Sequence, residues 1–202
     1  MKKILAVVIF SIIAFSIYWF TIRSKEGKSA PRQQALEVKK HSAAFNNSVA
    51  TAIQGYFEMK NAFVDADTGK IKEAGKKFIA LVDSIQLDEI KKDTAAIYAD
   101  ALSKIEDIKA NTNSILTQTD ITEMRHDFSW ISEALYPFFK LINYEGDKLY
   151  LQNCPMAFGE DKSANWISNS TEIINPYLGK NHPEYKGTML HCGTVKDTIK
   201  AQ

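Results

Sequence analysis

Both cysteines of the chain lie near its C-terminus, and each has a methionine close by. One stretch reads Cys154-Pro155-Met156, and the other reads Met189-Leu190-His191-Cys192-Gly193. Thiolate, thioether and imidazole groups are soft or borderline ligands that favour Cu(I) and, to a lesser degree, Zn(II). Because a residue before proline is extended, Cys154 and Met156 should point to the same side of the chain. The predicted metal ligands are Cys154, Met156, Met189 and Cys192, with His191 beside them.

A disulfide is the alternative role for the same two cysteines. Cysteine pairs in exported domains most often form disulfides. Closing the loop from Cys154 to Cys192 would add roughly 3–4 kcal/mol of stability in the chain-entropy model. His191 fits a ligand or a surface residue equally well, because adjacent side chains point apart in most backbones. The residues alone leave both roles open and favour the disulfide.

Enzymatic and nucleic-acid-binding functions find little support in the sequence. Phosphate loops, dinucleotide fingerprints and zinc-protease motifs are absent. Glu123 and His126 have the Glu-x-x-His spacing of di-iron bundles, but such a centre needs two copies and further carboxylates. The formal net charge is +1, whereas nucleic-acid binders show a basic face or excess. We therefore expect a protein that is not an enzyme and does not bind nucleic acid.

Apolar residues at helical spacing predict the elements that must position the cysteines. They recur three and four residues apart in four successive segments, which begin near Phe45, Ile71, Ile90 and Met124. Asp120 precedes the last segment as a predicted N-cap. The range 111–114 (Asn-Thr-Asn-Ser) predicts a break, and Pro137 should kink or end the last helix. Residues 33–146 therefore predict an antiparallel four-helix bundle.

The composition changes after Gly146, where glycine and proline become frequent. Residues 148–151 fit a short strand, and the rest of 147–202 reads as a loop-rich tail. Trp166 and Tyr177 are large enough to anchor this tail on the bundle. The predicted fold class is mainly α: a four-helix bundle, a C-terminal Cys/Met tail packed on it, and one preceding transmembrane helix.

The N-terminus predicts a membrane anchor. An apolar run spans residues 4–22 after Met1-Lys2-Lys3, and as a helix it would reach about 28 Å, close to the thickness of the hydrocarbon core. The bulky Tyr18-Trp19-Phe20 is unlike the small-residue site of a cleaved signal peptide, which is the alternative for residues 1–22. Residues 23–32 read as a polar linker. We expect an inner-membrane anchor with a periplasmic domain.

The C-terminal motifs also resemble a known family. They are Cys154-Pro155-Met156-Ala157, Trp166-Ile167-Ser168, Ile174-Asn175-Pro176-Tyr177-Leu178-Gly179, Met189 and Cys192-Gly193, preceded by Met124-Arg125 with Phe128 and Ser132. Over roughly residues 40–200 the chain resembles the domain of unknown function 3347 family of exported bacterial proteins. This chain departs from the family pattern by inserting residues 180–186, and it carries no adaptor domain.

The resemblance implies a function connected with metals. The family is similar to modules fused to periplasmic adaptors of heavy-metal efflux pumps, which implies copper or a related metal. It also implies that Cys154, Met156, Met189 and Cys192 are the metal residues. We therefore expect a membrane-tethered protein that binds Cu(I) for buffering, transfer or efflux, with a metal-efflux or metal-delivery protein as partner. The alternative is a non-catalytic interaction module with a Cys154–Cys192 disulfide.

Overall fold

The computed structural model describes residues 41–92 and 94–199. The predicted membrane segment, the linker and the first residues of the predicted bundle lie outside this part of the chain. Within it, no helix combines the length and the apolar character needed to cross a bilayer.

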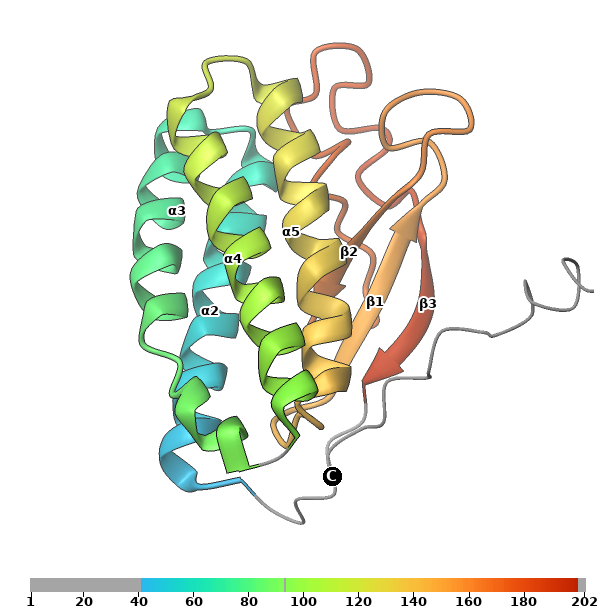
Figure 1. Cartoon of the computed structure of the whole chain (residues 1–202). Coiled ribbons are helices and arrows are strands. Elements are labelled where there is room, and N and C mark those ends of the chain that lie inside the picture. The colour runs from blue at the N-terminus through green and yellow to red at the C-terminus, as the bar shows by residue number, and fades with distance from the viewer. Residues whose placement is uncertain (1–40, 93, 200–202) are drawn as a thin grey trace, which may run out of the picture. The chain divides into compact units, whose positions relative to one another are not determined.

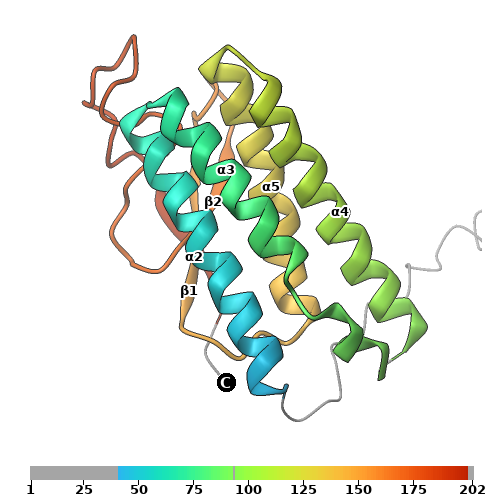
Figure 2. The ribbon, with the colours of Figure 1, turned by 90° about the vertical axis from the view of Figure 1, so that its left-hand side faces the viewer.

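Four α-helices make up most of the described residues, which confirms the mainly helical prediction. They are α2 (Ala43–Asp65), α3 (Thr68–Asp83), α4 (Ala95–Thr117) and α5 (Ile121–Leu141). Short connections join them, and the 3₁₀ helix η1 (Leu87–Lys92) bridges α3 and α4. The four helices lie side by side with successive helices antiparallel, as two perpendicular views show (Figures 1 and 2).

Each helix begins at a side chain that accepts a hydrogen bond from its first turn. Ser42, Asp67, Thr94 and Asp120 occupy the four N-cap positions. Asp120 was predicted, and its Oδ1 accepts from the amides of Thr122 at 2.6 Å and Glu123 at 3.2 Å. Because the first amides of a helix have no partner within the helix, these caps fix where each helix starts.

Two predictions about helix ends were wrong. The third helix begins at Ala95 rather than near Ile90, which belongs to η1. Residues 111–114 do not break α4: Asn111 and Thr112 bond back to the carbonyls of Asp107 and Ile108 at 2.8 and 2.7 Å. The buried Thr112 and Ile115 continue the apolar stripe, so packing outweighs the weak helix propensity of these residues.

Pro137 does not end the last helix, since α5 continues to Leu141. Proline removes one amide donor and disfavours the preceding turn. Phe138 and Phe139, which follow it, are at most 2% exposed. Their burial in the bundle core holds the last turn in helical form.

The C-terminal part contains more regular structure than the single short strand that was predicted. Strands β1 (Leu149–Cys154), β2 (Ala164–Ser168) and β3 (Thr194–Ile199) form one antiparallel sheet in the order β2-β1-β3. Most of β3 is exposed, so it lacks the apolar alternation that marks a strand in a sequence. Residues 194–199 form a strand because they pair with β1, and their side-chain pattern alone does not predict it.

A buried tyrosine joins the sheet to the bundle. The sheet lies against α5 (Figure 1). The Tyr56 hydroxyl, on α2, accepts a hydrogen bond from the Ile167 amide of β2 at 3.0 Å and lies 2.8 Å from Ser132 Oγ of α5. Tyr56 is 1% exposed, so no water can replace these partners. Trp166 and Tyr177 are both fully buried, which confirms them as anchors of the C-terminal part.

We expect Tyr56→Phe to lower the free energy of unfolding by about 1–3 kcal/mol, because it leaves the buried Ile167 amide without an acceptor. Urea unfolding followed by circular dichroism measures this. Tyr150→Phe, at a half-buried position of β1, is the matched control and should change stability by less than about 0.5 kcal/mol. Equal effects of the two substitutions would contradict the role of the Tyr56 hydroxyl.

Candidate functional site

Strand pairing brings the two cysteines together. Cys154 is the last residue of β1, and Cys192 lies two residues before β3, whose Thr194 pairs with Asn153. The Sγ atoms of Cys154 and Cys192 are 3.3 Å apart, and both cysteines are free. Cys154 is fully buried, whereas Cys192 is partly exposed. The pair thus joins a fully buried cysteine to a partly exposed one.

Asn175 holds the turn that carries Cys192. Its Nδ2 donates to the Cys192 carbonyl at 2.8 Å, and its backbone amide donates to the Leu190 carbonyl at 2.8 Å. Its Oδ1 accepts from the amides of Tyr177 and Leu178 at 2.8 and 2.9 Å. Asn175 is fully buried, so these bonds fix the turn to the rest of the tail. Its place in the Asn-Pro-Tyr motif was noted in the sequence, but its role as a positioning residue was not.

Gly193 allows the chain to pass closely over the site. Its φ is +146°, and a Cβ there would lie 2.8 Å from the Asn153 carbonyl oxygen and 2.9 Å from the Trp166 ring. A side chain would collide with both, and backbone atoms cannot move aside as a flexible side chain can. Glycine is therefore required where the chain turns from Cys192 into β3.

The two methionines flank the pair on adjacent loops. Met156 and Met189 are partly buried against the core, and the Met189 carbonyl accepts from the Cys192 amide at 3.0 Å across the turn. Their roles as ligands stay predictions. In the described ranges no group of three or more His, Cys, Asp and Glu side chains is arranged to hold a metal ion.

His191 is exposed, and its Nδ1 lies 2.8 Å from the Ile173 carbonyl, to which it donates. Such a bond fixes the ring and leaves Nε2 as the nitrogen with a free lone pair, an arrangement also seen in metal-bound histidines. The hydrogen bond to the Ile173 carbonyl, rather than the cysteine sulfurs, thus sets the orientation of the His191 ring. Its predicted place beside the metal ligands stays a prediction.

The donor set of the cysteine pair suits a soft metal ion. Two Zn–S bonds of about 2.3 Å at a tetrahedral angle hold their sulfurs about 3.8 Å apart, so the 3.3 Å pair would open slightly to admit an ion.

Burial, then the hydrogen bond and the charge of Cys154, raise the pKa of Cys192 to about 11. Cys192 is therefore a thiol at neutral pH, and a metal ion must displace its proton to bind.

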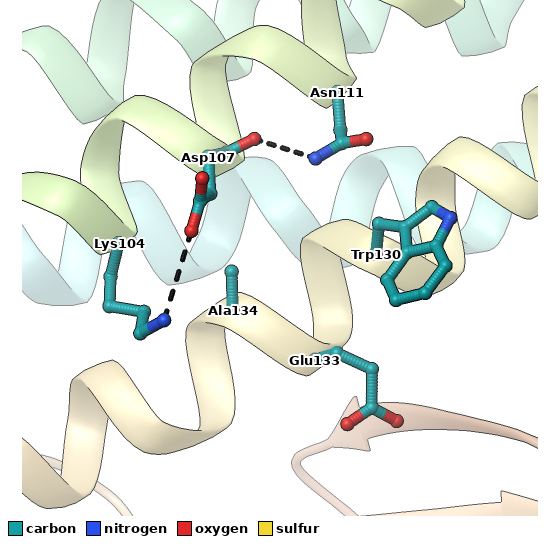
Figure 3. Close-up of a pocket in the computed structure, with 6 residues that line it drawn as sticks. All are labelled: Lys104, Asp107, Asn111, Trp130, Glu133 and Ala134. Carbon is teal, nitrogen blue, oxygen red and sulfur yellow. Dashed lines mark hydrogen bonds and ion pairs between the residues drawn. The ribbon is translucent and has the colours of Figure 1, made fainter.

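A cavity also lies between α4 and α5. It holds about 440 Å³, and its lining residues are Lys104, Asp107, Asn111, Trp130, Glu133 and Ala134. Figure 3 shows these side chains, with Lys104 and Asn111 directed toward Asp107. Trp130 is 62% exposed, which is unusual for so large an apolar ring. None of these residues carries a sulfur or imidazole ligand.

The fold and the site define a small helical protein whose three-stranded sheet holds a pair of free thiols. The family model described as "Protein of unknown function (DUF3347)" matches residues 52–146. Residues 52–146 are therefore similar to this family, as the sequence predicted. The match covers most of the helical part and ends before Cys154, so the cysteine and methionine motifs lie beyond it. Searches of curated proteins and of solved structures each returned no match.

We expect alkylation of Cys192 by iodoacetamide to be slow at pH 7 and to accelerate about tenfold per pH unit up to about pH 11. The thiolate is the reactive form, and burial beside Cys154 keeps Cys192 protonated. Mass spectrometry of the reduced full chain in detergent measures the rate, with Cys192→Ser as the control for Cys154. A rate that already levels off near pH 9 would show that the pKa of Cys192 is not raised.

Proposed function

We propose that this chain is a membrane-tethered, extracytoplasmic protein that binds a soft metal ion, Cu(I), and buffers it or hands it to another protein. The observation that carries the proposal is the 3.3 Å approach of the Cys154 and Cys192 sulfurs, with a methionine two or three residues from each cysteine. Thiolates and thioethers favour Cu(I) over harder ions. Zn(II) is the second ion that this donor set suits.

The asymmetry of the pair supports transfer by ligand exchange. Cys154 is fully buried at the end of β1, so it would hold the inner side of the ion. Cys192 is partly exposed on a turn, so a partner's donor could approach the ion from that side and take its place. The displaced Cys192 thiolate would then take up a proton, because burial raises its pKa. This sequence involves no change of oxidation state and no acid–base catalyst.

The tether and the compartment come from the N-terminal sequence. The apolar run of residues 4–22, after Lys2 and Lys3, favours an uncleaved anchor and export of the remaining chain. A metal-efflux or metal-delivery protein of the same compartment is the proposed partner. A membrane anchor would keep the cargo ion close to such a partner and raise its effective concentration.

A Cu(I) competition titration tests the proposal, with the reduced full chain in detergent micelles under anaerobic conditions. We expect tight one-to-one binding that is lost in the Cys154→Ser, Cys192→Ser double variant. Binding should also weaken as the pH falls, because protons compete for the thiolates. Failure of the reduced wild type to bind Cu(I) would refute the proposal.

The Met156→Leu substitution distinguishes a role of Met156 in metal binding from a role in packing. The swap nearly conserves volume, so stability should change by less than about 1.5 kcal/mol, whereas loss of a thioether ligand should weaken Cu(I) binding about tenfold, or about 1.4 kcal/mol. Met59→Leu, at a fully buried position of α2, is the matched control and should leave the affinity unchanged. An unchanged affinity in Met156→Leu would remove Met156 from the site.

A second candidate function is that of a non-catalytic interaction module with a Cys154–Cys192 disulfide. Two observations favour it: the same 3.3 Å sulfur contact, and the 62% exposure of Trp130, since exposed tryptophans are common at protein interfaces. The free-thiol count of protein taken from its native compartment discriminates the two functions. Two free thiols per chain are expected for metal binding, and none for the disulfide module.

A further inference from the structure

A pocket of about 540 Å³ lies at the start of α5, away from the α4–α5 cavity. Its walls come from α5, from the loop between β1 and β2, and from the segment that follows Gly179. The loops of the C-terminal part gather beside the start of α5 at the top of Figure 1. The lining residues that matter here are Arg125, His126, Phe158, Tyr177, His182 and Tyr185.

Arg125 is a buried cation with two guanidinium nitrogens that lack a hydrogen-bond partner in the described part of the chain. It is 2% exposed, and its Nε and Nη2 have no hydrogen-bond partner among the described residues. The nearby Asp120 is engaged in capping α5 through the Thr122 and Glu123 amides. A buried guanidinium that lacks acceptors destabilises a fold, because the desolvation of its N–H groups is not offset. The side chain lines the pocket, so an anion in the pocket could supply the acceptors.

The other walls suit the apolar body of a small molecule. The His126 ring stacks on Phe158 at a centroid distance of 3.8 Å, and Tyr177 meets Phe158 edge-on at 5.4 Å. The His182 ring lies 4.9 Å from that of Tyr185.

Burial, followed by the charge of Arg125, lowers the pKa of His182. His182 is therefore neutral at pH 7, and Glu184 is the carboxylate among the described lining residues. Arg125 is thus the cation that an anion would meet.

The wall opposite α5 is held firmly in place. The Lys180 amide donates to the Val64 carbonyl at 2.9 Å, and the Lys180 ammonium pairs with Asp65 at 2.8 Å. The Asn181 side chain donates to the Asp65 carbonyl at 2.9 Å. These bonds fix the segment to the end of α2.

We propose that this pocket binds a small organic anion whose carboxylate or phosphate pairs with the Arg125 guanidinium and whose apolar part lies against Phe158 and Tyr185. The planar guanidinium can donate two parallel hydrogen bonds to either oxyanion. The site uses none of the cysteines or methionines of the proposed metal centre. It is therefore a second binding site, independent of the metal proposal.

Isothermal titration of the full chain in detergent with two probes, benzoate and inorganic phosphate, tests the proposal. We expect saturable one-to-one binding of at least one probe, with benzoate tighter if the aromatic walls contribute. Arg125→Met should weaken that binding at least thirtyfold, whereas Lys76→Met should leave it unchanged. Lys76 is an exposed residue of α3, so this control removes one positive charge elsewhere. Absence of saturable binding of both probes would overturn the proposal.

A thermal-unfolding readout separates binding from a structural role of Arg125. The bound probe should raise the Tm of the wild type and not that of Arg125→Met. Without probe, Arg125→Met should melt at the same temperature as the wild type or higher, because it removes a buried guanidinium with two unpartnered nitrogens. The Arg125→Lys substitution keeps the positive charge but removes the planar group that donates two parallel hydrogen bonds. It should therefore weaken probe binding about tenfold. Unaltered probe affinity in both Arg125 variants would also overturn the proposal.

The same titrations distinguish this site from the metal centre. Probe binding should persist in the Cys154→Ser, Cys192→Ser variant, and Cu(I) binding should persist in Arg125→Met. Loss of probe binding in the cysteine variant, with the fold intact by circular dichroism, would contradict the independence of the two sites.

Discussion

The antiparallel pairing of β1 with β3 is the constraint on which the cysteine site depends. It aligns Asn153 with Thr194 and so places the preceding cysteine turn beside the end of β1. The Tyr56 hydroxyl then ties the neighbouring strand, β2, to two helices of the bundle. Because the sulfurs come from segments far apart in sequence, their separation follows from this pairing rather than from local geometry. The bundle acts as the rigid support of the site.

Sequence periodicity predicted the helical part well because four amphipathic stripes must each bury one face. It failed where polar residues lie in a helix: Thr112 was taken as part of a break, yet it is fully buried and bonded to the Ile108 carbonyl. It also missed β3, whose exposed side chains carry no alternation. In both cases the information lies in long-range contacts, which no local pattern contains.

The candidate site was predicted as a set of residue types, and the structure brings two members of that set together. Chemistry alone singled out Cys154 and Cys192, which lie in contact. The role of Asn175 could not be seen, because it depends on a turn that only the folded tail creates. Arg125 was visible as a motif residue, but the two unpartnered nitrogens of its side chain emerge only when its burial is known. A sequence pattern does not show whether a polar side chain is buried or which partners it has, so it says little about the function of such residues.

Because the two cysteines are far apart along the chain, the ribosome synthesises one of them well before the other. They are 38 residues apart, so at ribosomal rates of roughly 5–20 residues per second Cys154 is synthesised roughly 2–8 s before Cys192. During that interval Cys154 has no second thiol beside it, and the strand that would shelter it has not yet been made. A nascent chain is therefore most open to thiol oxidation or to capture of the wrong ion before the last strand arrives.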